Sequence, residues 1–167
     1  KSTIEPHFGE VSFFKVYNGE ITEGTDLVNS KSGTKERLGQ LFAVNGKNRD
    51  KLEKVVAGDI AASVKLKDTA TNSTLTTSKN SDDIVTPIEF PEPKFRVAVK
   101  AVNQGDDEKM GGILNAMHKA DQTLVVQYSK ELKQLILGGQ GELHLNITKW
   151  QIENLENIPL EFIAPKI

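Results

Sequence analysis

The sequence predicts two domains of different fold class, an all-β barrel or sandwich followed by a small α+β domain. Residues 9–75 are short β-rich runs that turn residues interrupt about every ten positions, without a long helical pattern. The stretch 94–167 instead alternates between the period of a strand and that of a helix. The prolines between these stretches fix φ and lack an amide donor. We therefore expect a barrel over 1–86, a proline-rich linker over 87–93 and an α+β domain over 94–167.

The composition is that of a folded protein. Of the 167 residues, 37% are hydrophobic and 26% are charged, a balance that supports a core and does not suggest disorder. The formal net charge of -2 gives no overall positive field, so any contact with RNA has to be local. The absence of cysteine excludes disulfides and thiolate metal sites and favours an intracellular protein. No apolar run approaches the roughly 20 residues of a membrane span, so we expect no membrane partner.

The strands of the barrel are separated by recognisable turns. Residues 11–17 are rich in β-branched and aromatic side chains, and the turn pair Asn18-Gly19 follows them directly. Residues 26–29 are another strand candidate. The sequence Ala57-Gly58-Asp59-Ile60 predicts a tight turn, in which glycine permits a positive φ and Asp59 bonds nearby amides.

The α+β domain has the element order strand, helix, strand, strand, helix, strand. Apolar and polar side chains alternate over 95–100, as in a half-buried strand, and acidic residues 106–108 begin a helix. A hairpin over 123–137, a second helix over 142–157 and a strand over 159–163 follow. The apolar positions of the first helix recur at helical spacing, at Met110, Ile113, Leu114 and Met117. This order is the split β-α-β arrangement of the ferredoxin-like fold.

Five segments in order along the chain carry a family resemblance. They are residues 5–19, Ala57-Gly58-Asp59-Ile60, Leu66-Lys67-Asp68-Thr69, residues 89–93 and Gly139-Gln140-Gly141-Glu142-Leu143-His144-Leu145. The first three resemble domain II of elongation factor G, a translation-factor β-barrel. The fourth resembles the interdomain linker of that family, and the fifth resembles the strand-to-helix signature of its domain III. An ordered set along nearly the whole chain is far more specific than any one segment.

The resemblance implies a non-catalytic, ribosome-binding and signal-transmitting segment of a translational GTPase that acts in translocation during protein synthesis. The chain has no phosphate-binding loop, since its one Gly-Lys pair, residues 46–47, continues with Asn48. We therefore expect no cofactor, metal or catalytic residue here, and we assign GTP and Mg²⁺ to a GTP-binding domain of the intact protein. The start at Lys1 is expected to be a fragment boundary.

The resemblance also implies partners and a location. The partners are the ribosome, through its small-subunit RNA and proteins, and the GTP-binding and distal domains of the same chain. The implied location is cytoplasmic. The alternative function is the same segment of a related translational GTPase, in ribosome protection, recycling or release-factor removal. Two adaptor domains unrelated to translation are the structural alternative.

The barrel holds two groups of candidate contact residues. Lys31, Lys35 and Arg37 crowd one predicted hairpin, and because domain II of the family touches small-subunit ribosomal RNA, the resemblance implies phosphate contact. A merely solvated lysine-rich face is the alternative. Lys67 and Asp68 either touch the GTP-binding domain of the intact protein or terminate a strand. The resemblance adds Asp59 to the candidate contacts, although turn geometry explains it first.

The second helix begins with Glu142 and His144. Side chains two apart on a helix diverge by about 200°, so this pair cannot converge on one proton or metal ion. Helix packing and hydrogen bonding at a domain junction is one interpretation of these residues. The resemblance implies the other, a contact with the ribosome or with the GTP-binding domain.

Gly138-Gly139-Gln140 admits an enzymatic alternative. Gly-Gly-Gln is the tripeptide with which release factors reach the peptidyl-transferase centre, so Gln140 would assist hydrolysis of a peptidyl ester. The favoured interpretation is that the glycines close a strand-to-helix turn and that Gln140 stands where relatives usually carry methionine. Two other departures, the scarcity of arginine over 146–156 and Val125 at a position where relatives often carry arginine, fit a divergent paralogue of the main translocation factor.

Overall fold

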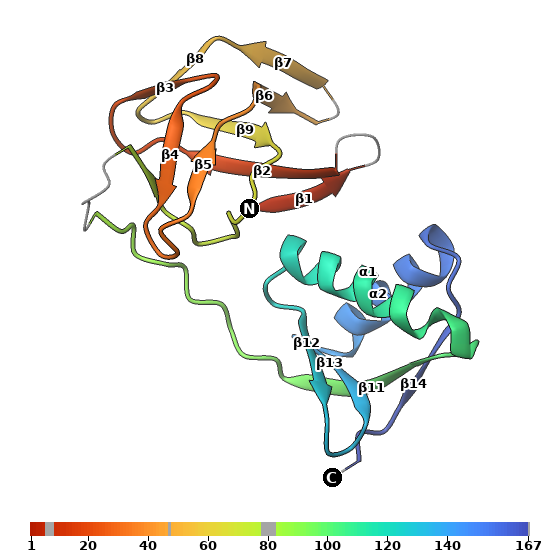
Figure 1. Ribbon diagram of the computed structural model, residues 1–167. Coiled ribbons are helices and arrows are strands. Elements are labelled where there is room, and N and C mark those ends of the chain that lie inside the picture. The colour runs from red at the N-terminus through yellow and green to blue at the C-terminus, as the bar shows by residue number, and fades with distance from the viewer. Residues whose placement is uncertain (6–8, 47, 78–82, 167) are drawn as a thin grey trace. The chain divides into compact units, whose positions relative to one another are not determined.

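The chain divides into two compact units, residues 1–88 (unit 1) and residues 89–167 (unit 2) (Figure 1). The computed structural model describes residues 1–5, 9–46, 48–77 and 83–166. Residues 6–8 of the first family-like segment and Lys47 of the Gly-Lys pair therefore lie outside the described residues. Among the described helices, none has the length and apolar character that crossing a bilayer requires.

The described part of unit 1 consists of short antiparallel strands in sheets of order β1-β2-β9-β6-β7, β10-β4-β5 and β3-β8. The strands are β1 (Ser2–Glu5), β2 (Gly9–Lys15), β3 (Glu20–Thr22), β4 (Asp26–Asn29), β5 (Lys35–Arg37), β6 (Leu41–Asn45), β7 (Asn48–Leu52), β8 (Lys54–Val56), β9 (Ile60–Val64) and β10 (Leu75–Thr76). Figure 1 shows them wrapped around a common interior.

One apolar core joins these sheets. Leu27 comes from β4, Leu41 from β6 and Val55 from β8, so each of the three sheets contributes a buried side chain to the same cluster. Complete burial of side chains of this size stabilises a fold by about 1.5–3 kcal/mol each. Among the described residues, the buried members of this cluster are Val16, Leu27, Leu38, Leu41, Val55 and Ala61. The predicted all-β barrel is confirmed.

Sequence signals and observed strands agree best where a strand is half-buried. β2 overlaps the predicted strand 11–17 but begins and ends two residues earlier. Gly19 in the following turn has a φ of +73°. β7 has a charged sequence and gives no strand signal. It pairs with β6 at the edge of its sheet, where a strand needs few apolar side chains and charged residues discourage further strand pairing.

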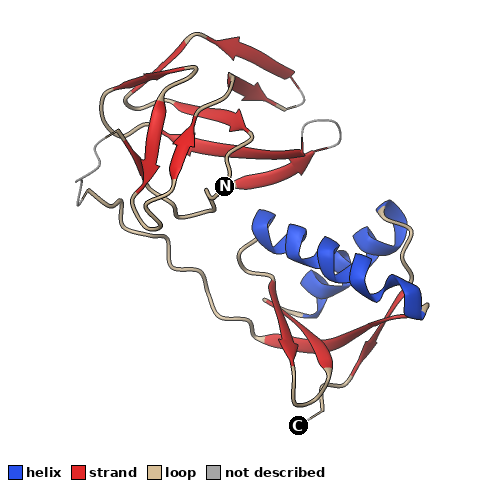
Figure 2. Ribbon diagram, viewed as in Figure 1, coloured by secondary structure: helices blue, strands red, loops and turns tan. Residues whose placement is uncertain are grey.

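Unit 2 is a four-stranded antiparallel sheet of order β12-β13-β11-β14 with two helices. Its elements are β11 (Phe95–Ala101), the short 3-10 helix η1 (Gln104–Asp106), α1 (Asp107–Ala120), β12 (Val125–Ser129), β13 (Gln134–Gly139), α2 (Glu142–Leu155) and β14 (Leu160–Ile163). Both helices lie on the same side of the sheet (Figure 2). In this order the first strand lies between the third and the fourth, which is the predicted ferredoxin-like arrangement.

Both helices cover the sheet, and the buried face of α1 is the one that the sequence predicts. In α1, Met110 and Leu114 are buried, and Ile113 and Met117 pack against the core. In α2 the buried residues are Leu145, Thr148 and Ile152. The first turn of α1 is acidic and its last turn is basic, a distribution that complements the helix dipole.

Candidate functional site

The predicted cationic residues of unit 1 lie together on the β4–β5 hairpin. Lys35 and Arg37 are two apart on β5 and therefore point to the same side of the strand, where both are exposed. Lys31 lies in the connecting turn, and its backbone N–H donates a hydrogen bond to Oδ1 of Asn29 (3.0 Å). Arg37 faces Asp26 across the strand pair, with 3.8 Å between Nη1 and Oδ1. Because both of these side chains are largely exposed, their ion pair neutralises the hairpin only weakly.

Glu36 fixes the position of this hairpin. Its side chain points inward between Lys35 and Arg37, and only 2% of the residue is exposed. The carboxylate accepts hydrogen bonds from the backbone N–H groups of Lys67 (2.9 Å) and Asp68 (2.7 Å) and from the hydroxyl of Thr69 (2.9 Å). A buried carboxylate is tolerated only when it is bonded in this way. Glu36 therefore ties the loop that follows β9 to the hairpin.

Asp68 adds further bonds between the same loop and the hairpin. Its Oδ2 accepts a hydrogen bond from the hydroxyl of Thr34 (2.8 Å), and its carbonyl oxygen accepts one from Nδ2 of Asn29 (2.7 Å). Hydrogen bonds from the Ser32 and Thr34 hydroxyls hold the pKa of the Asp68 carboxyl below its ordinary value. Residues that the sequence placed in two separate groups therefore form one surface.

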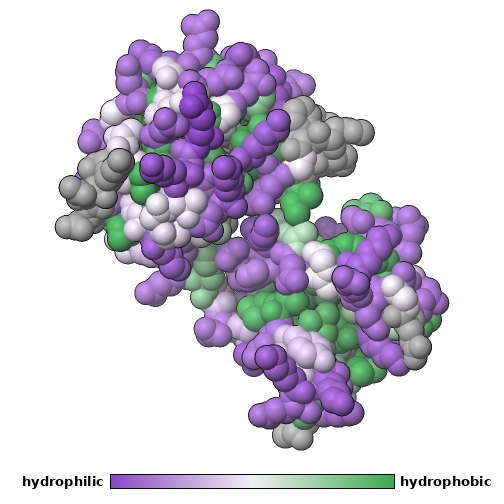
Figure 3. Space-filling model, viewed as in Figure 1, coloured by the Kyte–Doolittle hydropathy of each residue, from purple (hydrophilic) through white to green (hydrophobic). Residues whose placement is uncertain are grey.

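We call this the hairpin–loop surface, and it consists of Lys31, Lys35, Arg37, Lys67 and Asp68, all exposed. Hydrophilic residues cover the region of β4 and β5 in Figure 3. The hydrogen bonds to the buried carboxylate of Glu36 hold the backbone of this surface in place. The exposed cations Lys35 and Arg37 on either side of Glu36 give the surface a charged outer face. Such a surface can bind anionic groups without first having to order its backbone.

Asp59 serves the turn in which it lies. Its Oδ2 accepts a hydrogen bond from the N–H of Val56 (3.2 Å), and its carbonyl oxygen accepts one from the N–H of Val16 (3.0 Å). Gly58 has a φ of +100°, the positive value that the turn was expected to need. The geometric interpretation of this segment is confirmed.

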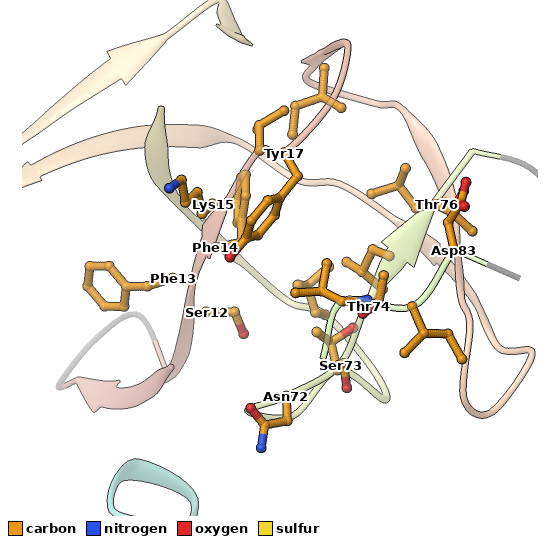
Figure 4. Close-up of a pocket in the computed structure, with 18 of the residues that line it drawn as sticks. Ser12, Phe13, Phe14, Lys15, Tyr17, Asn72, Ser73, Thr74, Thr76 and Asp83 are labelled. Carbon is orange, nitrogen blue, oxygen red and sulfur yellow. Dashed lines mark hydrogen bonds between the residues drawn. The ribbon is translucent and has the colours of Figure 1, made fainter. Parts of the chain in front are cut away.

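A pocket of about 700 Å³ opens on unit 1 beside β2 (Figure 4). Phe14 of β2 and Tyr17, which follows β2, line one side, and Ser73 and Thr74 line it from the loop before β10. The ammonium group of Lys15 lies 5.3 Å from the centroid of the Tyr17 ring, within range of a cation–π contact. Residues 83–88, which leave the barrel toward unit 2, complete the lining.

The expectation that Gly138 and Gly139 close a turn is wrong. They are the last two residues of β13 and pair with Arg96 and Phe95 of β11. Neither has a positive φ. Glycine is needed here for close packing, because a Cβ on Gly138 would lie 3.0 Å from the Cβ of Pro93 and a Cβ on Gly139 would lie only 2.6 Å from Leu145 Cδ2.

Gln140 is engaged with the linker. Its Nε2 donates hydrogen bonds to the carbonyl oxygens of Pro91 (3.1 Å) and Glu92 (3.3 Å). Its backbone N–H donates to Nδ1 of His144 (3.2 Å). The Gly-Gly-Gln tripeptide thus ends a strand and holds its amide against the chain, instead of projecting it from a long loop.

His144 joins the two helices of unit 2 through a residue that the sequence did not single out. Its Nε2 lies 3.3 Å from Oδ2 of Asp121, which follows α1. Because Nδ1 accepts from Gln140, the proton of the neutral ring is on Nε2 and points at Asp121. Glu142, at the start of α2, is exposed. The structure therefore pairs His144 with Asp121 and leaves Glu142 at the surface.

The environment of Asp121 favours its charged form. Oδ1 accepts hydrogen bonds from the hydroxyl (2.6 Å) and the backbone N–H (2.9 Å) of Thr123. Partial burial on its own would raise the pKa of this carboxyl, but the bonds from Thr123 and the neighbouring His144 outweigh burial and hold the pKa below its ordinary value. Among the described residues, no cluster of three or more His, Asp or Glu side chains is arranged to bind a metal.

Helix α2 also presents an apolar stripe to solvent, made of Leu143, Ile147 and Trp150 at spacing i, i+4 and i+7. Their exposed fractions are 72%, 49% and 58%. Exposed apolar groups of this size on one helix face commonly mark a contact surface. The helical period was visible in the sequence, but which of its faces is buried was not.

Comparisons with known proteins agree with the two units. The family model described as Elongation factor G domain 2 matches residues 1–78, and the one described as Elongation Factor G, domain III, matches residues 90–162. A crystal structure of a protein from Thermus thermophilus covers 100% of this chain with 26% sequence identity and a TM-score of 0.84. The present chain spans 25% of that protein's length. Two consecutive domain matches over a shared two-domain fold show that the chain belongs to the elongation factor G family and carries its domains II and III.

Proposed function

We propose that this chain is the ribosome-binding and signal-transmitting segment of a translational GTPase that acts in translocation during protein synthesis. Domains II and III of the family are non-catalytic segments of a translational GTPase. The observation that carries the proposal is the hairpin–loop surface, on which Lys31, Lys35 and Arg37 project from a hairpin held by buried Glu36. A cytoplasmic location follows from this function.

The hairpin–loop surface suits contact with small-subunit ribosomal RNA. The net charge of the chain is -2, so binding cannot depend on an overall positive field. Local cations that neutralise phosphates can supply the affinity and position the protein without reading base sequence. Lysine acts as a point charge for this purpose, and Arg37 can also form a bidentate contact.

GTP and Mg²⁺ belong, in this proposal, to a separate domain of the intact protein. The phosphate-binding loop that would cradle a triphosphate has no counterpart in the sequence. Hydrolysis of a peptidyl ester by Gln140 is disfavoured, because its amide is bonded to the carbonyl groups of Pro91 and Glu92. The chain contributes binding and transmission to the reaction of the whole protein.

The apolar stripe of α2 is the proposed contact with the GTP-binding domain or the distal domains. Leu143, Ile147 and Trp150 are large and well exposed, and covering them would remove apolar surface from water. The contact between Asp121 and His144, with 3.3 Å between Oδ2 and Nε2, holds the first turn of α2 against the residue that follows α1. A force applied to the stripe would therefore move α1 and α2 together.

The test compares two double variants of the intact protein with the same change of net charge. Lys31→Gln/Lys35→Gln removes two charges from the hairpin, and Lys51→Gln/Lys54→Gln removes two from β7 and β8. Binding to small ribosomal subunits is measured over a series of salt concentrations. Affinity falls as salt rises, so the slope of log affinity against log salt is negative. We expect the hairpin variant to make this slope less negative by about 2.

The control variant should leave that slope unchanged. Its lysines pair with Glu23 and Glu20 in exposed salt bridges of 3.2 and 3.1 Å, so the fold tolerates their removal. Equal slopes for the wild type and the hairpin variant would remove the support for RNA contact by this surface. An equal loss of ribosome affinity in both double variants would indicate a general effect of net charge, and would contradict a specific role of the hairpin.

A further inference from the structure

The segment between the units has the composition of a long flexible tether. Residues 83–94 contain three prolines and form no helix or strand. Nearly every side chain in this segment is exposed, including Ile84, Ile88 and Phe90. Packing of these side chains therefore does little to hold the segment in place. Its backbone, however, is bonded at both ends.

Asn72 holds the end that belongs to unit 1. Its Nδ2 donates to the carbonyl oxygen of Ile88 (2.9 Å), and its Oδ1 accepts from the N–H of the same residue (3.0 Å). The side-chain amide thus pairs with one backbone residue as a neighbouring strand would. Two residues away, the hydroxyl of Thr74 accepts a hydrogen bond from the N–H of Val85 (3.1 Å).

The loop that carries Asn72 is itself fixed to the barrel. Asn72 has a φ of +71°, in the left-handed region that Asn adopts more readily than most residues with a side chain. The N–H of Ser30 donates to the carbonyl of Thr74 (2.9 Å), and β10 begins at the next residue and pairs with β4. The backbone of residues 85–88 is therefore attached to a rigid part of unit 1.

Gln140 holds the end that belongs to unit 2. Its Nε2 faces the carbonyl oxygens of Pro91 and Glu92, and the reverse amide orientation would place oxygen against oxygen. Pro93 is buried against Gly138, and the N–H of Lys94 donates to the carbonyl of Gly139 (2.9 Å). Residues 91–94 are therefore attached to the end of β13 and the start of α2.

We infer that motion between the two units is confined to a two-residue hinge, Glu89 and Phe90, because Asn72 clamps the chain before it and Gln140 clamps the chain after it. Phe90 precedes Pro91, which disfavours the α region for Phe90 and so restricts its backbone conformations further. The hinge thus has very few soft dihedral angles. This inference does not depend on the proposed function, but a confined pivot transmits a displacement that a long tether would absorb.

The test measures backbone order along the segment by ¹⁵N relaxation of the whole chain. In the wild type, the heteronuclear NOE of Ile88, Glu92 and Lys94 should equal that of the strands, and only Glu89 and Phe90 should be lower. Gln140→Met keeps the length of the side chain and removes the amide donor. In that variant the NOE of Glu92 should fall to the value of the hinge residues.

Asn72→Gly tests the other clamp and keeps the positive φ. The amide of Ile88 should then lose its order and exchange with solvent about tenfold faster, as expected for the loss of one net hydrogen bond. Asn72→Asp is the second variant, since it keeps an acceptor for the Ile88 N–H and loses the donor. Asn157→Gly is the matched control, because Asn157 also has a positive φ (+56°) and lies in unit 2.

Several results would overturn the inference. One is an NOE for Ile88 or Glu92 in the wild type as low as that of Glu89. Another is an unchanged NOE in Gln140→Met or unchanged exchange in Asn72→Gly. Chemical shifts of β2 and β13 report whether each unit stays folded. If Asn157→Gly lowered the order of the Ile88 amide as much as Asn72→Gly does, the role of the Asn72 clamp would also be contradicted.

Discussion

Replacing Glu36 by glutamine removes the group on which the hairpin–loop surface depends. The carboxylate offers two oxygens, and three donors from Lys67, Asp68 and Thr69 occupy them. Glutamine has nearly the same shape but keeps only one oxygen. Its NH₂ group would face at least one backbone N–H, so at least one donor would lose its acceptor inside the fold.

The magnitude follows from these contacts. Hydrogen bonds to a charged group contribute about 1.5–3 kcal/mol each, and an unsatisfied buried donor costs about 1–3 kcal/mol. Lys67 and Asp68 are exposed, so water can reach part of the broken network and reduce the loss. We expect Glu36→Gln to lower the free energy of unfolding of unit 1 by roughly 2–3 kcal/mol. Glu53→Gln, at an exposed position before β8, is the matched control and should change it by less than about 0.5 kcal/mol.

Urea unfolding followed by two probes separates the units. The chain has one tryptophan, Trp150 of α2, so its fluorescence reports on unit 2. Amide signals of β2 and β9 in NMR spectra report on unit 1. Glu36→Gln should lower the urea midpoint of the strand signals and leave the Trp150 transition where it is. A shift of less than about 0.5 kcal/mol in unit 1, on the order of an ordinary surface change, would refute the assigned role of Glu36.

Two further predictions concern unit 2. The lowered pKa of Asp121 means that its contribution to stability is complete above the unfolded value near 3.8 and is lost as pH falls through the folded value. Urea unfolding followed by Trp150 fluorescence at a series of acidic pH values should show this loss in the wild type and not in Asp121→Asn, with an amplitude below about 1 kcal/mol because the side chain is half exposed. Gly139→Ala places a Cβ 2.6 Å from Leu145 and should destabilise unit 2 by about 1–3 kcal/mol in urea. Gly112→Ala, on the exposed side of α1 with open space around it, should stabilise by up to about 1 kcal/mol, and equal effects of the two changes would contradict the packing argument.

The fold could be predicted where local pattern and burial agree. The strand predicted over 11–17, the turn at Asn18-Gly19 and the apolar positions of α1 follow from short-range patterns. The structure has all three, although the strand runs over Gly9–Lys15, two residues earlier than predicted. Ala98 departs from the predicted alternation, because it is fully buried on the side of β11 that was expected to be polar. Its register partners on both sides are isoleucines, Ile136 and Ile163, which can cover a side chain as small as alanine.

The candidate site could be predicted only in part. Lys31, Lys35 and Arg37 are close in sequence, and their common hairpin was visible. Glu36 was not singled out, because its partners lie more than 30 positions away. Asp121 follows α1 and His144 lies on α2, so their pairing depends on where the fold places the end of α1 and the start of α2. Long-range pairings of this kind leave no periodic signal in a single sequence.

The glycines before α2 show a different limit. A glycine pair followed by Gln140 suggested a turn, since positive φ is a common reason for glycine. The structure places the pair in a strand, where Pro93 and Leu145 leave no room for a Cβ. Sequence alone does not distinguish a glycine required by its φ from one required by its neighbours.

The most direct test of the central claim is sedimentation with ribosomes of the purified chain and of the intact protein. The account predicts that both sediment with ribosomes at low salt, that raising the salt concentration weakens this binding, and that the intact protein binds more tightly when GTP is present. If neither the chain nor the intact protein sediments with ribosomes at any salt concentration, the chain is not a ribosome-binding segment and the proposed function is wrong.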